Sequence, residues 1–263
     1  MTDLKITQQQ TKLKVLLIGD SCIDEYKIGT VDRVSPEAPV PIIKLVDQYS
    51  LPGMSANVKK NLEALDIIPD FVTNTTEIVK TRYIDKRSGQ HMLRVDTEPK
   101  VTQWDGKTPN PIELYNAIII SDYNKGFLSY ENIEFIIQST NGYVFIDTKK
   151  QDLSRFSADW TFVKINELEY KNRNNDPKNL IVTLGGDGAK FCQYDKKVHF
   201  LAKKVDVVDV CGCGDTFLSA LAYRFLCTNN IENAIIFANT AASITVQRRG
   251  NYAPNLTEIT NGY

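Results

Sequence analysis

Two glycines one residue apart stand directly before an aspartate and an apolar stretch in the segment 208–222, VDVCGCGDTFLSALA. The glycines predict a tight turn, and the apolar stretch predicts a helix that begins there. The N–H groups at the start of a helix have no partner within it, and the helix dipole also favours anions at that end. We therefore expect the amides of Gly212, Cys213 and Gly214 to bind a phosphate group.

Asp215 follows this loop in the first turn of the predicted helix, where the helix dipole is expected to keep its carboxylate ionised. Beside an acceptor hydroxyl, Asp215 would take the proton as the oxygen attacks a γ-phosphate, while the loop amides stabilise the transferring group. The alternative is that Asp215 only caps the helix, and a G-x-G-D string alone does not decide between the two.

Short apolar runs, typical of buried parallel strands, alternate with helix-like stretches along the chain. The runs are 14–19, 117–121, 143–147, 161–164 and 180–184, and the helical stretches are 55–65, 130–138, 215–227 and 231–246. This alternation predicts an α/β fold with a doubly wound, mostly parallel sheet flanked by helices. Ligands of such folds bind beyond the carboxyl ends of the strands, so we expect the chemistry at that edge.

Two segments break the alternation. Residues 26–49 contain three prolines and a β-rich tail, and residues 79–96 suit a hairpin that turns at Ser88 and Gly89. Together they predict a small β lid over the strand ends, although surface loops without a role would explain them equally well. Residues 1–13 are polar and predict a flexible leader, so we expect a single domain over residues 14–263.

The composition of the 263-residue chain argues against several classes of protein. A net charge of -1 is too balanced to favour nucleic acid or an anionic membrane as partner. No apolar run approaches the ~18 residues of a membrane span. Five scattered cysteines and only two histidines indicate neither a disulfide scaffold nor a zinc site, and they favour a reducing, cytoplasmic location. Cys211 and Cys213 flank the anion loop, where a thiol pKa can be lowered, although small buried filler is their commoner role.

The segment 208–222 resembles the second signature of the ribokinase-like (PfkB) carbohydrate kinases, usually D-T-x-G-A-G-D. In that family the last aspartate is the catalytic base and the glycines form the anion hole. Four positions match the signature, namely Asp209, Gly212, Gly214 and Asp215, and two depart from it, namely Val210 and Cys213. The resemblance implies ATP and Mg²⁺ as cofactors, allows a monovalent cation, and weighs against a cap-only role for Asp215.

Other family motifs follow in the family's order. Gly19-Asp20 with Asp24 resembles G-D-x-x-x-D, and PGMSANV at 52–58 resembles P-G-G-x-A-N, which together imply that Asp24, Gly53 and Asn57 bind the sugar. Asn166 and Glu169 fit N-x-x-E, which positions Mg²⁺ through water. The residues implied to bind the nucleotide are Asn166, Glu169, Thr183, Gly185, Gly188 and Asn239. By position alone Asp24 also suits a turn, Asn57 a helix cap, and the Asn166–Glu169 pair a capping network.

The segment 33–44, RVSPEAPVPIIK, is very similar to the lid segment of D-glycero-β-D-manno-heptose 7-phosphate kinases, the kinase half of the bifunctional lipopolysaccharide heptose enzymes. Residues 93–96, 121–126 and 146–153 also resemble heptose kinase segments. The resemblance implies transfer to O1 of heptose 7-phosphate, and a homodimer formed through the lid. The other residues expected to bind the substrate are Arg82, Arg94, Asp122, Lys125 and Lys149, and the basic ones among them could hold the sugar phosphate. Guanidinium groups bind phosphate through paired hydrogen bonds, whereas solvated surface charge is the alternative for the basic residues.

The chain also departs from the family. Met54 replaces the second glycine of P-G-G, Thr148 replaces the proline of D-P-K, and the segments 70–79 and 169–180 are short. We expect a trimmed kinase without an adenylyltransferase domain. A kinase of another sugar (ribose, fructose or a hexose phosphate) and a non-catalytic sugar- or nucleotide-binding protein are the alternatives; the retained Asp215 argues against the second. A nicotinamide dehydrogenase is excluded because the first strand leads into GDSCID rather than G-x-G-x-x-G.

Overall fold

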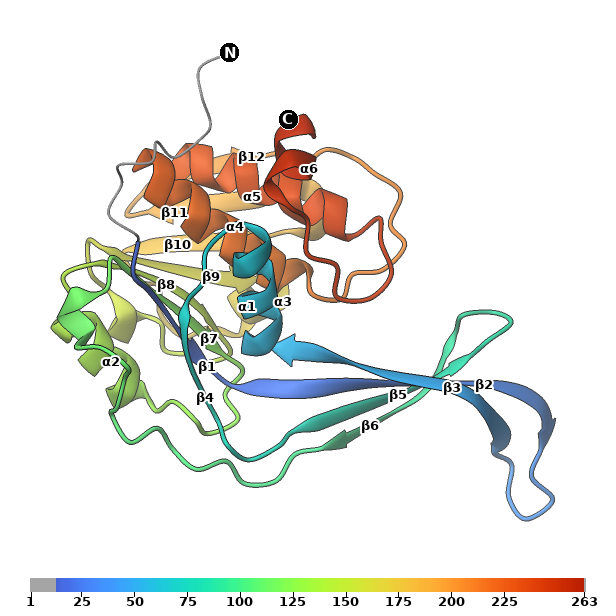
Figure 1. The fold of residues 1–263 in the computed structure, drawn as a ribbon. Coiled ribbons are helices and arrows are strands. Elements are labelled where there is room, and N and C mark those ends of the chain that lie inside the picture. Colours follow the sequence, from blue (N-terminus) through green and yellow to red (C-terminus); the bar gives the residue numbers. More distant parts are fainter. Residues whose placement is uncertain (1–12, 263) are drawn as a thin grey trace.

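The structure, a computed structural model, describes residues 13–262, so all of the expected leader except Leu13 lies outside the described residues. Its main sheet has the strand order β12-β11-β10-β9-β8-β7-β1-β4 (Figure 1). The parallel strands are β1 (Val15–Gly19), β4 (Asp70–Thr73), β7 (Ala117–Asp122), β8 (Tyr143–Thr148), β9 (Thr161–Asn166) and β10 (Asn179–Thr183). Two antiparallel strands, β11 (Ala189–Gln193) and β12 (Lys196–Phe200), complete one edge. The predicted mostly parallel sheet is confirmed.

Helices cover both faces of this sheet, which explains why its central strands are continuous apolar runs. Residues Val15 and Leu17 of β1 lie in one core with the helices α1 (Ser55–Ala64), α4 (Cys213–Thr228), α5 (Ile231–Thr245) and α6 (Leu256–Asn261). Leu16 and Ile18 lie in the other core with α2 (Tyr130–Ser139). The remaining helices are α3 (Glu167–Asn172) and the short 3₁₀ turns η1 (Ile112–Leu114), η2 (Ser154–Phe156) and η3 (Gly185–Asp187). No helix within residues 13–262 is long and apolar enough to cross a membrane.

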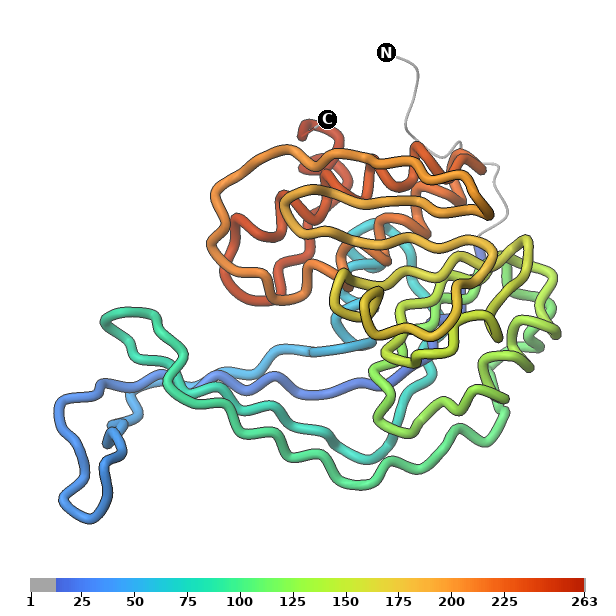
Figure 2. Tube along the Cα trace, turned by 180° about the vertical axis from the view of Figure 1, so that it is seen from behind, coloured from blue at the N-terminus to red at the C-terminus, as the bar shows by residue number. Residues whose placement is uncertain are grey.

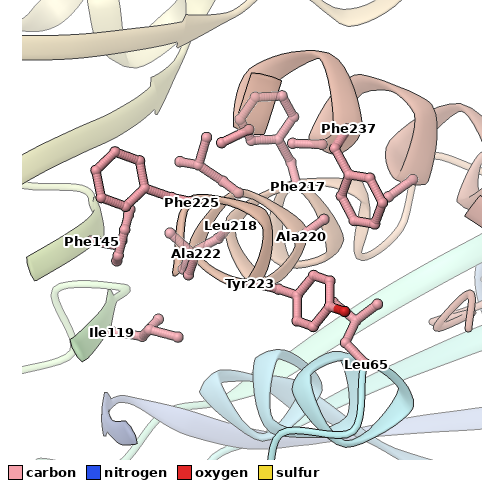
Figure 3. Packing of buried hydrophobic residues seen from close by; sticks show 14 of the residues in the cluster. Leu65, Ile119, Phe145, Phe217, Leu218, Ala220, Ala222, Tyr223, Phe225 and Phe237 are labelled. Atoms are coloured by element: carbon pink, nitrogen blue, oxygen red, sulfur yellow. The ribbon is translucent and has the colours of Figure 1, made fainter. Parts of the chain in front are cut away.

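The helix α4, which begins with Cys213 and Gly214 of the anion loop, lies at the centre of the first core (Figure 3). Phe225 packs against Phe145 of β8 with ring centroids 5.6 Å apart, and Tyr223 packs against Phe237 of α5 at 5.9 Å. Residues of α4 are buried on most of its circumference, from Asp215 to Tyr223 without interruption. The start of α4 is therefore held rigidly by the core beneath it.

A second sheet, in the order β3-β2-β5-β6, projects from the main body as an arm (Figures 1 and 2). Its strands are β2 (Ser21–Val34), β3 (Pro41–Met54), β5 (Val79–Asp85) and β6 (His91–Thr97), which include the two segments expected to form a lid. The predicted turn lies between β5 and β6, where Gly89 has a φ of 71°. Along β2, buried and less buried residues alternate only near the body, so its outer end projects into solvent.

Candidate active site

The anion loop is built on Gly212, which precedes α4 with a φ of 74° in the left-handed region that favours glycine. A side chain at Gly212 would come within 2.7 Å of Asn57 Nδ2, and one at Gly214 within 2.9 Å of Lys164 Nζ. Gly212 is therefore required by its backbone conformation and its packing, whereas a side chain at Gly214 would displace the Lys164 ammonium. Among the described residues, the Gly214 amide has no hydrogen-bond acceptor and the Cys213 amide donates only a long bond of 3.4 Å to Val210 O. These amides are available to an anion.

Asp215 is buried beside this loop and does not cap the helix. Its Oδ2 accepts a hydrogen bond from Asn57 Nδ2 at 2.8 Å, and its Oδ1 accepts one from the Tyr123 hydroxyl at 2.9 Å. The pKa of Asp215 is raised to about 6, mainly by burial and also by the Asp147 carboxylate, while the hydrogen bond from Asn57 opposes the rise. The carboxylate is expected to stay ionised at the start of the helix, and burial opposes this by raising its pKa. A base with this pKa is still largely ionised at neutral pH, which suits general-base catalysis.

The raised pKa leads to a prediction about pH dependence. Only the ionised carboxylate can accept a proton, so kcat/KM should fall about tenfold per pH unit below about pH 6, rather than below the ~4 of an ordinary aspartate. The measurement is kcat/KM between about pH 4.5 and 8.5 at saturating ATP. A profile that stays flat down to about pH 5 would contradict the assignment of Asp215 as the base.

The expected sugar residues lie on the lid side of Asp215. Asp24 is buried within β2 and accepts hydrogen bonds from Arg82 NH1 at 2.6 Å and Asn251 Nδ2 at 3.2 Å. A side chain at Gly53 would lie 2.4 Å from Asp24 Oδ2, so glycine is needed where β3 passes this carboxylate. Since Asp24 lies in a strand and Asn57 bonds to Asp215, neither the turn nor the helix-cap alternative holds. Asn57 instead links the expected sugar segment to Asp215.

Met54, whose effect on the sugar site could not be predicted, is buried in a hydrophobic core. Its backbone φ is 56°, a conformation that favours glycine, which accounts for the glycine usual in the family motif. The side chain is 4% exposed and belongs to the core cluster that contains Ile18 and Ile78. The methionine therefore fills the core at the cost of a strained backbone.

The two lid arginines differ in their surroundings although they face each other across β5 and β6. Arg82 is buried, pairs with Asp24 and lies over the Tyr26 ring, with 5.4 Å to the ring centroid. Arg94 is exposed and forms two bonds of 2.7 Å with Asp96. The alternative of solvated strand charge is therefore wrong for Arg82 and describes Arg94 better.

The lysines expected near the substrate are also paired. Lys125 donates to Glu98 at 2.6 Å, while Lys149 pairs with Glu169 and lies 5.5 Å from the centroid of the Tyr123 ring. Lys149 is thus close to a residue that contacts the base, whereas Lys125 belongs to a surface ion pair.

The assignment of Asp122 to the substrate site is wrong. Asp122 is only 1% exposed, and its Oδ2 accepts a hydrogen bond from the Thr148 hydroxyl at 2.6 Å and lies 3.2 Å from Lys150 Nζ. Its Oδ1 accepts a bond from the Asn124 amide at 3.0 Å. Both carboxylate oxygens of Asp122 therefore accept hydrogen bonds from within the protein. The same contacts explain Thr148, whose hydroxyl a proline could not supply.

The four residues expected at the nucleotide, apart from the Asn166–Glu169 pair, surround one cavity of about 240 Å³. They are Thr183, Gly185, Gly188 and Asn239, and Cys213 and Gly214 of the anion loop line the same cavity. Gly188 has a φ of 90°, and a side chain there would lie 2.1 Å from Phe200 O. The cavity therefore reaches from the glycine turn after β10 to the anion loop, as a nucleotide with its phosphates would require.

Asn166 and Glu169 form the capping network that was the alternative for them. Asn166 Oδ1 accepts a hydrogen bond from the backbone N–H of Glu169 at 2.9 Å. Glu169 Oε2 accepts one from the backbone N–H of Asn166 at 2.8 Å. Within residues 13–262, no three Asp, Glu, His or Cys side chains cluster as a metal site would require. This donor set fits Mg²⁺ only through water, which is how this cation usually binds beside substrate phosphates.

The two thiols of the anion loop are not activated. Burial raises the pKa of Cys211 to about 11 and that of Cys213 to about 12. The Asp209 carboxylate raises both further. The start of the helix therefore does not lower the pKa of these thiols below the usual value. Both cysteines fit better as small side chains that fill space in the loop than as reactive thiols.

Three residues of the site were missed from the sequence. Tyr123 bonds to Asp215, Lys164 lies against Gly214, and Asn251 bonds to both Asp24 and Pro52 O. Tyr123 belongs to the segment 121–126, so a signal for it was present. Lys164 and Asn251 lie in no recognised motif, and only the folded chain brings them to the site.

Comparisons with known proteins agree with this geometry. Residues 146–258 match the family described as pfkB family carbohydrate kinase. The bifunctional protein HldE of a Nitratiruptor species is 30% identical, and the alignment covers 94% of this chain and 64% of that protein. The HldE protein of Aliivibrio salmonicida is 28% identical over 93% of this chain and 62% of its own length. The chain thus spans less than two thirds of these relatives.

Solved structures show the same fold. The ribokinase of Thermotoga maritima superposes with a TM-score of 0.72 at 20% identity, covering 95% of this chain and 99% of the ribokinase. The ribokinase of Arabidopsis thaliana, solved with ribose and ATP, gives a TM-score of 0.69 at 15% identity over 96% of this chain and 99% of that one. The fold is therefore ribokinase-like, with its mostly parallel sheet and flanking helices.

Proposed function

We propose that the chain, whose residues 146–258 match the pfkB family carbohydrate kinase model, is an ATP-dependent kinase that transfers the γ-phosphate of ATP to O1 of D-glycero-D-manno-heptose 7-phosphate. One structural observation supports phosphoryl transfer as the reaction. Asp215, with its pKa raised to about 6, lies between Asn57 of the sugar segment and the anion loop that lines the nucleotide cavity. The sugar is chosen because the lid segment 33–44 resembles that of heptose 7-phosphate kinases.

In the proposed reaction, Asp215 takes the proton of the acceptor hydroxyl as its oxygen attacks the γ-phosphorus. The bond from phosphorus to the β,γ-bridging oxygen breaks, and ADP leaves. The amides of Gly212, Cys213 and Gly214 stabilise the charge on the transferring group. Asn57 and Tyr123 hold the carboxylate in place, because each donates one hydrogen bond to it.

The cofactors are ATP and Mg²⁺. Mg²⁺ neutralises phosphate charge when it is bound, and Glu169 would reach it through water, with Asn166 orienting the carboxylate. Asp24 and Gly53 would orient the sugar. Arg82 and Lys149, which pair with Asp24 and Glu169, are the groups proposed to contact its existing phosphate.

An ATP-consumption assay over a panel of acceptors tests this function. The panel contains heptose 7-phosphate, ribose, fructose and hexose phosphates, each with and without Mg²⁺. We expect the highest kcat/KM with heptose 7-phosphate. A higher kcat/KM with another sugar would identify that sugar as the substrate in place of heptose 7-phosphate. If no sugar is turned over but the ligands still raise the Tm, the protein is better described as a non-catalytic binding protein.

We also propose that two copies pair through their lids. The outer part of the lid exposes large apolar side chains that have no cover in the single chain, among them Val34, Leu45, Val46, Leu93 and Val95. Exposed apolar area of this kind favours association. Sedimentation velocity at about 10 µM should therefore give a mass twice that of the 29.7 kDa chain. The variant Leu45→Asp should sediment with the mass of a single chain. A monomeric wild-type protein at this concentration would contradict the pairing.

A further inference from the structure

The side chain of Lys164 lies beneath the anion loop and has no role in the reaction described above. Its ammonium would be 2.9 Å from a Cβ placed on Gly214, so it points at the backbone of the loop. We propose that Lys164 is a further catalytic residue, whose ammonium donates hydrogen bonds to a non-bridging oxygen of the transferring phosphoryl group. This inference rests on the proposed kinase function.

The position of Lys164 follows from the sheet. Lys164 near the end of β9 is in register with Asp147 of the neighbouring parallel strand β8. Their side chains form an ion pair of 2.7 Å and are 4% and 10% exposed, respectively. Because the carboxyl ends of parallel strands meet at one edge of the sheet, the pair lies directly under the start of α4.

The hydrogen bonds of Lys164 are incomplete. An ammonium group has three donors, yet within residues 13–262 the only acceptor for Lys164 Nζ is Asp147 Oδ2. Taking two charges out of water is costly, and a buried pair normally repays this cost through further hydrogen bonds. Lys164 therefore has donor capacity left for a ligand.

A second buried lysine, Lys150, which follows the end of β8, shows the contrast. Lys150 pairs with Asp122 at 3.2 Å and also donates to Asn124 Oδ1 at 3.0 Å and Leu128 O at 2.9 Å. Its side chain is 4% exposed, the same fraction as that of Lys164. Three acceptors satisfy its three donors, so Lys150 is a structural residue. The difference between the two lysines is one of hydrogen bonding and not of burial.

The surroundings identify the ligand as a phosphoryl group. Gly214 is both the nearest point of the loop to Lys164 and a lining residue of the nucleotide cavity. The Gly214 amide has no acceptor among the described residues, so two kinds of donor converge on one place. The cationic charge would stabilise the negative charge of the transition state, and Asp147 would hold the ammonium in position without substrate.

The chemical balance of the reaction does not change. The acceptor oxygen bonds to the γ-phosphorus, the bond to ADP breaks, and the hydroxyl proton passes to Asp215. Lys164 keeps all three of its protons and contributes hydrogen bonds and charge alone.

Lys164→Met in the full chain tests this inference. We expect kcat to fall about 30-fold, as for the loss of one charge-assisted hydrogen bond, with the KM for the sugar changed less than about twofold. The double variant Asp147→Asn with Lys164→Met removes both charges, so no buried carboxylate is left unpaired, and it should show the same fall. Lys150→Met is the matched control, expected to lower the Tm but to keep kcat within about threefold of wild type.

A second measurement does not depend on turnover. Aluminium fluoride with MgADP mimics the transferring phosphoryl group, and it should raise the Tm of the wild type beyond the effect of MgADP alone. The double variant should lose this increment and keep the effect of MgADP. A double variant with wild-type kcat and the full increment would overturn the proposal and leave the pair a structural role. If the wild type shows no turnover, the proposed kinase function is refuted instead. The additional rise in Tm caused by aluminium fluoride then still shows whether Lys164 binds the phosphoryl group.

Discussion

Asp215→Asn is expected to lower kcat by about 100-fold or more, the usual effect of losing a general base. The amide retains the shape of the carboxylate and can still accept a hydrogen bond from Tyr123, but it cannot take the proton of the acceptor hydroxyl. Steady-state kinetics with heptose 7-phosphate and ATP measures this loss. MgADP should still raise the Tm of the variant as it does that of the wild type, because the side chain does not line the nucleotide cavity.

Tyr123→Phe provides a graded comparison for this prediction. It removes one of the two hydrogen bonds that oppose the raised pKa of Asp215, so the acid limb of the pH profile should move to higher pH. The loss in kcat at neutral pH should be much smaller than that of Asp215→Asn. A rate for Asp215→Asn within about threefold of wild type would remove Asp215 from the mechanism.

Arg82→Leu is expected to lower the free energy of unfolding by about 3–5 kcal/mol, because it leaves Asp24 buried without its partner. The side chains of Arg82 and Asp24 are 11% and 8% exposed, and their atoms lie 2.6 Å apart. Since Asp24 is expected to orient the sugar, the KM for the acceptor should also rise at least tenfold. Urea unfolding and steady-state kinetics measure the two effects.

Arg94→Leu is the matched control for this prediction. Arg94 lies opposite Arg82 on β6, but its side chain is 49% exposed, and exposed pairs contribute at most about 1 kcal/mol. Arg94→Leu should therefore change the free energy of unfolding by less than that amount. Equal losses of unfolding free energy in the two variants would show that the buried Arg82–Asp24 pair stabilises the fold no more than the exposed Arg94–Asp96 pair does.

The main sheet could be predicted from the sequence because its central strands are apolar runs buried on both faces. All six residues of β7 are buried, and a short apolar run of this kind is typical of a central parallel strand. The strands β4, β11 and β12 were not predicted. Every residue of β12 is exposed or partly exposed, so its sequence carries no apolar run. The pairing of such edge strands depends on their neighbours rather than on their own residues.

The candidate site could be predicted where backbone geometry demands particular residues. Gly212 has a backbone conformation that favours glycine and lies close to Asn57, so the sequence pattern identifies this turn. Charge states and partners could not be predicted in this way. The pKa of Asp215 depends on its burial in the folded chain. Asp122 was expected to bind the substrate, but in the structure it contacts Thr148 and Lys150 instead. Both depend on residues distant in the sequence.

Phosphorus NMR of the reaction with heptose 7-phosphate and MgATP tests the central claim most directly. The proposed function predicts a new sugar phosphate signal coupled to the anomeric proton, appearing at the rate at which ATP is consumed, and its absence with Asp215→Asn. ATP consumption without this signal, or a phosphate on any other carbon, would contradict the claim.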